Sequence, residues 1–173
     1  YTWSRNSQAH RLTPWSNDPV IDPHGEAVYV RDDDTGALWC PLPGPAPAPC
    51  PYEVRHGFGY SRFVCTTAGL AHDTVMFVPE HDPVRIVRLR LTNEGGRRRH
   101  VSVVSYCRLV MGSIADVPGA IVTSHDAEHG ILYARNPGGN EFRDGIAFAA
   151  VVAEGGVDAR RFTCDRASFI GRN

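Results

Sequence analysis

The first 19 residues combine the side chains that proteins use to hold sugars. Trp3 and Trp15 stand among arginine, asparagine and aspartate in the stretch TWSRNSQAHRLTPWSNDP. An indole covers the apolar face of a pyranose, while amide, carboxylate and guanidinium groups bond to its hydroxyls. The composition therefore indicates a sugar-binding surface, but a loop pinned to the protein body by its tryptophans would have the same composition. Spacing alone leaves both interpretations open.

A second candidate lies in the stretch YEVRHGFGYSRF, where two glycines interrupt a run of strand-forming residues. Gly57 and Gly59 permit a bend between two strands, and this bend would re-aim His56 and Tyr60. A catalytic histidine needs an acidic group to orient it and a nucleophile to activate. The neighbouring glutamate and serine do not establish such an arrangement, so we expect His56 to be a structural residue, with a catalytic role as the alternative.

Other chemistry-bearing residues lack the spacing that their chemistry requires. The five cysteines form no CxxC pair and no zinc-finger pattern, so we expect reduced thiols, a reducing compartment and no metal site. Asp32-Asp33-Asp34 lacks the spacing and the closing glutamate of a calcium loop, and we expect a solvated turn there. Arg97-Arg98-Arg99 is expected to be solvated at a hairpin end. No GxSxG, HExxH or Walker-type motif occurs.

Short β-strands must position these residues. Strand-like runs recur between Gly, Pro, Asn and Asp, and helical periodicity is nearly absent. The Asp/Gly stretch 32–36 is predicted to be a hairpin turn. Many short strands at regular spacing predict an all-β fold, an antiparallel sandwich or barrel. The expected strands cover residues 28–31, 37–40, 60–67, 75–78, 85–91, 100–106, 131–135, 146–152 and 160–164, and the strand-like stretches include Cys65, Cys107 and Cys164.

Two segments depart from this pattern of regularly spaced short strands. Residues 1–27 are expected to form a polar aromatic loop segment. Residues 41–51 contain six prolines, which cannot donate ladder hydrogen bonds and predict an extended surface loop. No second domain boundary is evident, so residues 1–173 are expected to form a single β-sandwich domain.

Composition narrows the classes of function. The chain carries 18 basic residues, all of them arginine, against 19 acidic residues, which gives a formal net charge of -1. This balance argues against nucleic-acid binding, which needs clustered positive charge. No apolar run is long enough to span a bilayer, so we expect no membrane contact by this domain. The chain begins without methionine and is expected to be a fragment of a larger multidomain enzyme.

Four motifs together resemble glycoside hydrolase family 94: TWSRNSQAHRLTPWSNDPV, EAVYVRDDDTGALWCPL, YEVRHGFGYSRF and DRASFIGRN. Within that family they are most similar to the phosphorylase-like region of bacterial cyclic β-1,2-glucan synthases. The resemblance covers essentially the whole chain. It implies the family's N-terminal supersandwich, an antiparallel, galactose-mutarotase-like β-sandwich truncated at both ends. In the parent protein this sandwich would support an (α/α)6 catalytic barrel.

The resemblance also implies a reaction, which is inverting phosphorolysis or its reverse, with inorganic phosphate as co-substrate of the parent. The family's general acid and phosphate-binding residues belong to the barrel, so we expect this fragment to be non-catalytic and to hold no cofactor. The expected partners are a β-glucan oligosaccharide and the barrel of the same polypeptide, with a homodimer left open. The implied substrate-binding residues, at the rim of the barrel, are Arg5, Asn6, Arg11, Trp15, Asn17, Asp18, His56 and Tyr60.

Three alternatives accompany this interpretation. The closest is the sandwich domain of a soluble, cytoplasmic β-disaccharide phosphorylase of the cellobiose or chitobiose type. The others are an autonomous carbohydrate-binding module and a purely structural support that touches no ligand. If the parent is the synthase, which is anchored in the bacterial inner membrane, the domain is expected on the cytoplasmic side.

Overall fold

The computed structural model describes residues 11–14, 20, 24–112, 120–138, 143–155 and 160–171. Within these ranges the chain forms ten β-strands and one short helix. The elements are β1 (Glu26–Asp32), β2 (Leu38–Trp39), β3 (Glu53–Gly57), β4 (Tyr60–Thr67), β5 (Leu70–Phe77), β6 (Ile86–Asn93), β7 (Val101–Cys107), β8 (Val122–Asp126), β9 (Ile131–Arg135), β10 (Ala147–Ala150) and α1 (Arg166–Ile170).

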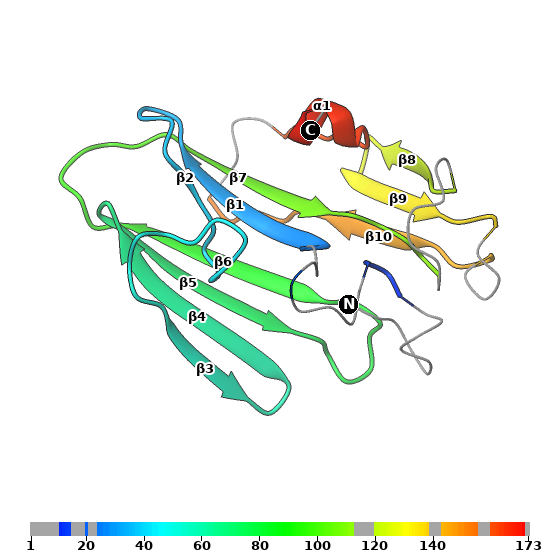
Figure 1. Ribbon diagram of the computed structural model, residues 1–173, viewed down its shortest axis with the longest axis horizontal. Helices are drawn as coiled ribbons and strands as arrows, with labels where there is room; N and C mark the ends of the chain where they lie inside the picture. Colours follow the sequence, from blue (N-terminus) through cyan, green and yellow to red (C-terminus); the bar gives the residue numbers. More distant parts are fainter. Residues whose placement is uncertain are drawn as a thin grey trace.

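The strands form three antiparallel sheets (Figure 1). The largest has the order β3-β4-β5-β6, with each strand paired to the next along the chain. A second sheet has the order β2-β1-β7 and faces the first, and a third sheet has the order β10-β9-β8. The predicted all-β antiparallel sandwich is confirmed.

Two predicted turns are present and depend on glycine. β1 pairs with β2 across the aspartate-rich turn, and Gly36 adopts a φ of 77° there. β3 pairs with β4 across the two-residue turn Phe58-Gly59, where Gly59 has a φ of 78°. A positive φ is sterically costly for other residues, so glycine allows both reversals at little cost.

The main core lies between the two facing sheets. Its buried members come from β1, β2, β4, β5 and the Pro-rich loop, and they are Val30, Trp39, Cys65, Leu70 and Ala48. Alternation along the strands directs these side chains inward, and Leu89 and Leu91 of β6 pack against them from the same face. A smaller core of Met111 and Ala134 lies under the third sheet.

A hydrogen-bonded histidine lies inside the main core. Trp39 Nε1 donates to His72 Nε2 at 3.0 Å, and Cys65 Sγ lies 3.3 Å from His72 Nδ1. An indole N–H can only donate, so His72 Nε2 must accept and Nδ1 must carry the imidazole proton. Burial lowers the pKa of His72, because the cation would lose its hydration. The core therefore requires neutral His72.

The aspartate triplet and the arginine triplet meet in space, contrary to expectation. The Asp32 side chain is 3% exposed, and its Oδ2 accepts hydrogen bonds from Arg99 Nη1 at 2.9 Å and Arg97 Nη2 at 3.2 Å. The prediction of a solvated turn is therefore wrong for Asp32, and that of a solvated run is wrong for Arg99, whose side chain is 9% exposed.

The same contacts correct the hairpin expected at the arginine triplet. β6 and β7 belong to different sheets, so the chain crosses between sheets there. Asp32 Oδ1 accepts from the N–H groups of Asp34 and Thr35, while Arg99 also donates to the carbonyl oxygen of Ala68. One buried carboxylate thus ties the β1–β2 turn, the β6–β7 connection and the β4–β5 turn together.

The Pro-rich segment is folded back on the core rather than extended. The Cys40 N–H donates to the Ala46 carbonyl at 2.6 Å, and Cys40 forms a parallel bridge with Pro47. The Tyr52 hydroxyl accepts from the Ala48 N–H and donates to the Cys40 carbonyl. These bonds satisfy backbone groups that the prolines leave without ladder partners, so the segment can bury Pro41 and Ala48.

Near the C-terminus one strand prediction is wrong. Residues 160–164 form no strand, and Cys164 lies in a coil that leads into α1. The helix starts after Asp165, whose Oδ1 accepts from the Ala167 N–H at 3.0 Å as an N-cap. Five residues are too few to show helical periodicity in a sequence.

Candidate functional site

A groove of about 920 Å³ opens between the two facing sheets at one end of the sandwich. Antiparallel order brings the starts of β1, β4 and β6 to this end together with the ends of β3, β5 and β7. The groove is therefore lined by residues from six strands, and the Pro-rich loop contributes Leu42.

The groove has an apolar floor. Val28 of β1 lies one alternation from the core residue Val30, and Met76 and Val87 are opposite each other on β5 and β6. These side chains continue the core toward the open end of the sandwich, so a bound molecule would meet apolar surface at the base of the groove.

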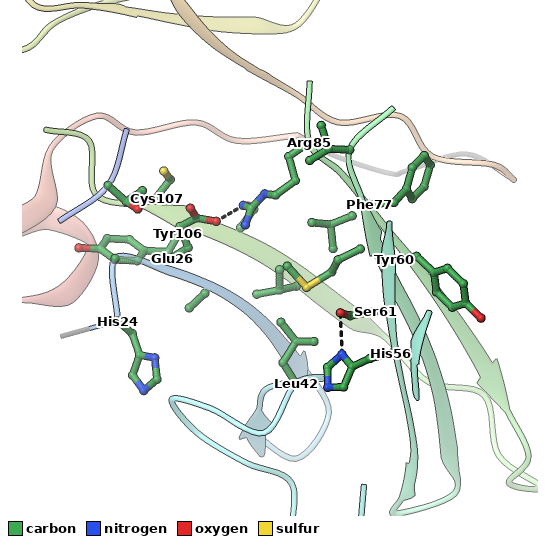
Figure 2. A pocket seen from close by; sticks show the side chains of 18 of the residues that line it. His24, Glu26, Leu42, His56, Tyr60, Ser61, Phe77, Arg85, Tyr106 and Cys107 are labelled. Carbon is green, nitrogen blue, oxygen red and sulfur yellow. Dashed lines mark hydrogen bonds and ion pairs between the residues drawn. The ribbon is translucent and has the colours of Figure 1, made fainter. Parts of the chain in front are cut away.

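An ion pair crosses the groove. Glu26 begins β1 and Arg85 immediately precedes β6, and their side chains pair across the gap (Figure 2). The Glu26 side chain is 16% exposed and that of Arg85 is 27% exposed. The pair thus places charged hydrogen-bonding groups where solvent or a polar ligand can reach them.

His56 and Ser61 form a second polar pair on the opposite wall. They face each other across the β3–β4 ladder, and His56 Nδ1 lies 2.9 Å from Ser61 Oγ (Figure 2). The His56 ring also meets Phe63 edge to face, with centroids 6.3 Å apart. These two contacts orient the imidazole beside the groove.

Tyr60 takes its position from Gly57. The two residues are opposite each other at the close of the hairpin, and the Tyr60 ring lies against the Gly57 backbone, where a Cβ would collide with it. Glycine at this position therefore has a packing reason, because a side chain would push the aromatic ring out of this place against the hairpin.

The remaining rim comes from segments outside the large sheet. His24 and Pro14 line the groove from the N-terminal side. Tyr106 of β7 also lines it and stacks on Phe169 of α1 at a centroid distance of 5.5 Å. The short helix therefore holds the Tyr106 ring on the outer side of β7.

The structure brings together two of the residues predicted from the sequence. His56 and Tyr60 both line the groove. Arg11 does not line it, but the Arg11 carbonyl accepts from the Gly112 N–H at 3.0 Å, and the lining residues Thr13 and Pro14 follow after one intervening residue. Other predicted residues lie outside the described residues: Arg5, Asn6, Trp15, Asn17 and Asp18.

Sequence reasoning missed the Glu26–Arg85 pair. A signal was available, since Glu26 alternates with Val28 and Val30 and must share their inward face. A charged residue on a core face calls for a partner. Nothing in the sequence, however, identifies Arg85 as that partner.

The described lining of the groove carries few acidic groups. Among the described residues that line it, Glu26 carries the only carboxylate, and that carboxylate is paired with Arg85. Inverting glycosidases need a carboxylic acid together with a base or an external nucleophile. The Glu26–Arg85 pair and the His56 imidazole above an apolar floor suit a polyol with apolar ring faces.

The whole chain, residues 1–173, matches the family model described as "Glycosyl hydrolase 94, supersandwich domain". It is 34% identical to the cyclic beta-(1,2)-glucan synthase NdvB of Rhizobium meliloti strain 1021, over 99% of this chain and 6% of that protein. A solabiose phosphorylase of Paenibacillus borealis is 31% identical over 82% of this chain and 21% of its own length. An N,N'-diacetylchitobiose phosphorylase of Vibrio furnissii is 28% identical over 66% of this chain and 15% of its own length.

The chain thus spans 6% to 21% of the length of these three relatives. In the part that the structure describes, no helix has the length and apolar character needed to cross a membrane.

Proposed function

Because the chain belongs to glycosyl hydrolase family 94 as its supersandwich domain, we propose that it is the non-catalytic sandwich of a polypeptide that acts on β-glucan chains. The resemblance predicted from the motifs is confirmed. The observation that carries the proposal is the 34% identity to a cyclic β-(1,2)-glucan synthase across 99% of this chain.

The domain has two tasks in this proposal. It supports the (α/α)6 barrel of the same polypeptide, and it holds a β-glucan segment in the groove between its sheets. The barrel supplies the general acid and uses inorganic phosphate as co-substrate, on the cytoplasmic side of the inner membrane. The single, ion-paired carboxylate among the described lining residues supports a holding role rather than a catalytic one.

Glucan would bind by contacts that the groove already offers. Val28, Met76 and Val87 provide an apolar surface for pyranose rings at the base of the groove. Glu26, Arg85 and His56 provide donors and acceptors for hydroxyls. Affinity in such open sites is low, because each polar contact replaces a bond to water.

A titration of the 173-residue chain with linear and cyclic β-1,2-glucans tests the holding role. We expect saturable changes in backbone amide shifts at Glu26, Tyr60 and Val87, and a weaker response in His56→Ala. His100→Ala is the matched control, because His100 is also an exposed histidine but pairs with Asp34, away from the groove lining. A folded chain that shows no shifts at millimolar glucan would contradict glucan holding and favour a purely structural domain.

A second candidate is the sandwich domain of a soluble disaccharide phosphorylase. It is favoured by the phosphorylases among the relatives, at 31% and 28% identity. The same titration separates the two, because a disaccharide phosphorylase domain should respond to β-disaccharides as strongly as to long β-1,2-glucans. A preference that grows with chain length supports the glucan synthase.

A further inference from the structure

The outer edge of the large sheet is a strand without a neighbour among the described residues. β3 pairs with β4 on one side only, and no described segment lies beyond it in Figure 1. Every residue of β3 is exposed. An exposed edge strand presents a row of unpaired N–H and C=O groups that can accept another strand.

The hairpin determines which backbone groups point to this edge. Gly57 and Tyr60 close the two-residue turn as a hydrogen-bonded pair, and hydrogen-bonded and non-hydrogen-bonded pairs then alternate along the ladder. Gly57, Arg55 and Glu53 therefore direct their backbone groups to β4. His56 and Val54 direct theirs outward. The open edge thus offers donors and acceptors on both sides of Arg55.

The charges on β3 select one way of pairing two copies of this strand. Antiparallel pairing about Val54 places Glu53 of each copy opposite Arg55 of the other. Pairing about Glu53 would oppose two carboxylates, and pairing about Arg55 would oppose two guanidinium groups. Opposite charges directly across a ladder are stabilising and like charges are destabilising. The sequence of β3 is therefore complementary to itself in the register centred on Val54.

The side chains of β3 are free to form these ion pairs between two copies. The Glu53 and Arg55 side chains are 54% and 65% exposed and pair with each other along the strand, so each can turn to a second copy. Val54 is 41% exposed and would meet its own copy on the inward face.

We propose that β3 is a self-association surface: two copies of this chain pair antiparallel along β3 about a twofold axis at Val54. The two four-stranded sheets become one continuous eight-stranded sheet. The association uses backbone hydrogen bonds at the edge and two reciprocal Glu53–Arg55 pairs. It is independent of the proposed glucan-holding role, since it needs no ligand.

The test is the mass of the 173-residue chain by sedimentation equilibrium over a range of concentrations. We expect a reversible dimer. Arg55→Glu turns two attractive cross-strand pairs into two repulsive ones and should raise the dissociation constant about tenfold or more. Glu53→Arg should have the same effect. Both substitutions lie on an exposed strand, and circular dichroism verifies that each variant is folded.

Mixing the two variants is the decisive step. The Glu53→Arg variant has arginine at both positions 53 and 55, and the Arg55→Glu variant has glutamate at both. An equimolar mixture should therefore form a heterodimer with the wild-type dissociation constant. Arg88→Glu on β6, at the other edge of the same sheet, is the matched control and should leave the constant unchanged. A wild-type monomer, an Arg55→Glu dimer of unchanged affinity, or a mixture that stays dissociated would each overturn the proposal.

Discussion

The buried carboxylate of Asp32 gives the sharpest prediction of stability. Its side chain is 3% exposed and accepts four hydrogen bonds, two from backbone N–H groups of its own turn and two from Arg97 and Arg99. Asp32→Ala removes all four and leaves the Arg99 guanidinium, with its 9% exposed side chain, without its carboxylate.

The expected loss in the free energy of unfolding depends on how deeply each partner of Asp32 is buried. Stranding the buried charge of Arg99 costs about 3 kcal/mol. The two turn bonds contribute about 1 kcal/mol together, because water replaces them in part. Arg97 is 51% exposed, and its pair is worth about 0.5 kcal/mol at most. We therefore expect Asp32→Ala to lower the free energy of unfolding by about 4 to 5 kcal/mol, most of the stability of a marginal domain.

Urea unfolding followed by circular dichroism and tryptophan fluorescence measures this loss. Asp32→Asn keeps an acceptor for the turn but loses the charge, so it should cost about 3 kcal/mol and separate the two contributions. Asp33→Ala is the matched control, because Asp33 pairs with Arg31 and Ser102 at the solvent-exposed surface, where water replaces the lost contacts, and its effect should be far smaller. A loss in Asp32→Ala no greater than in Asp33→Ala would refute the reasoning.

Three further predictions follow from the groove and the core. Burial lowers the pKa of His72 below its ordinary value of about 6.5, so its contribution to stability is complete above that pH and is lost as the pH falls through the folded-state pKa. Urea unfolding between pH 7 and 5 should show a loss of up to about 1.4 kcal/mol per pH unit from this group, and His72→Gln, which keeps an acceptor for Trp39, should reduce the slope. Gly57→Ala should displace the Tyr60 ring, disturb the hairpin that carries His56 and so weaken glucan binding in the titration, whereas Gly96→Ala, with open space around it, should bind as wild type does. Glu26→Gln should lower the free energy of unfolding by about 1 to 2 kcal/mol and weaken glucan binding, and unchanged values of both would show that the pair contributes to neither.

Local sequence predicted the parts of the fold that local chemistry decides. The turns at Gly36 and Gly59 have positive φ, and both stood out as glycines between strand-like runs. The strand around Leu89 alternates apolar and charged residues, which is the pattern of a sheet with one buried face.

Prediction failed where the deciding partner lies far away in the chain. Asp32 and Arg99 look like solvated charges until the fold brings them within 2.9 Å across 67 positions. Residues 160–164 have strand-like composition, but a strand forms only when a neighbour provides ladder partners, and none does so in the described ranges. His56 and Tyr60 were predicted because glycines flank them, and they stay predictions, whereas Glu26 and Arg85 carry no such local signal.

The hydrogen bond from Trp39 to His72 also allows the opening of the core to be followed by hydrogen exchange. Trp39 is 4% exposed and His72 is 1% exposed, so solvent reaches the indole hydrogen only when the two sheets separate. Its replacement by deuterium therefore proceeds at the rate set by opening of the whole sandwich, and each additional 1.4 kcal/mol of stability slows it about tenfold. One indole resonance, followed after transfer to heavy water, thus reports how often the sandwich opens.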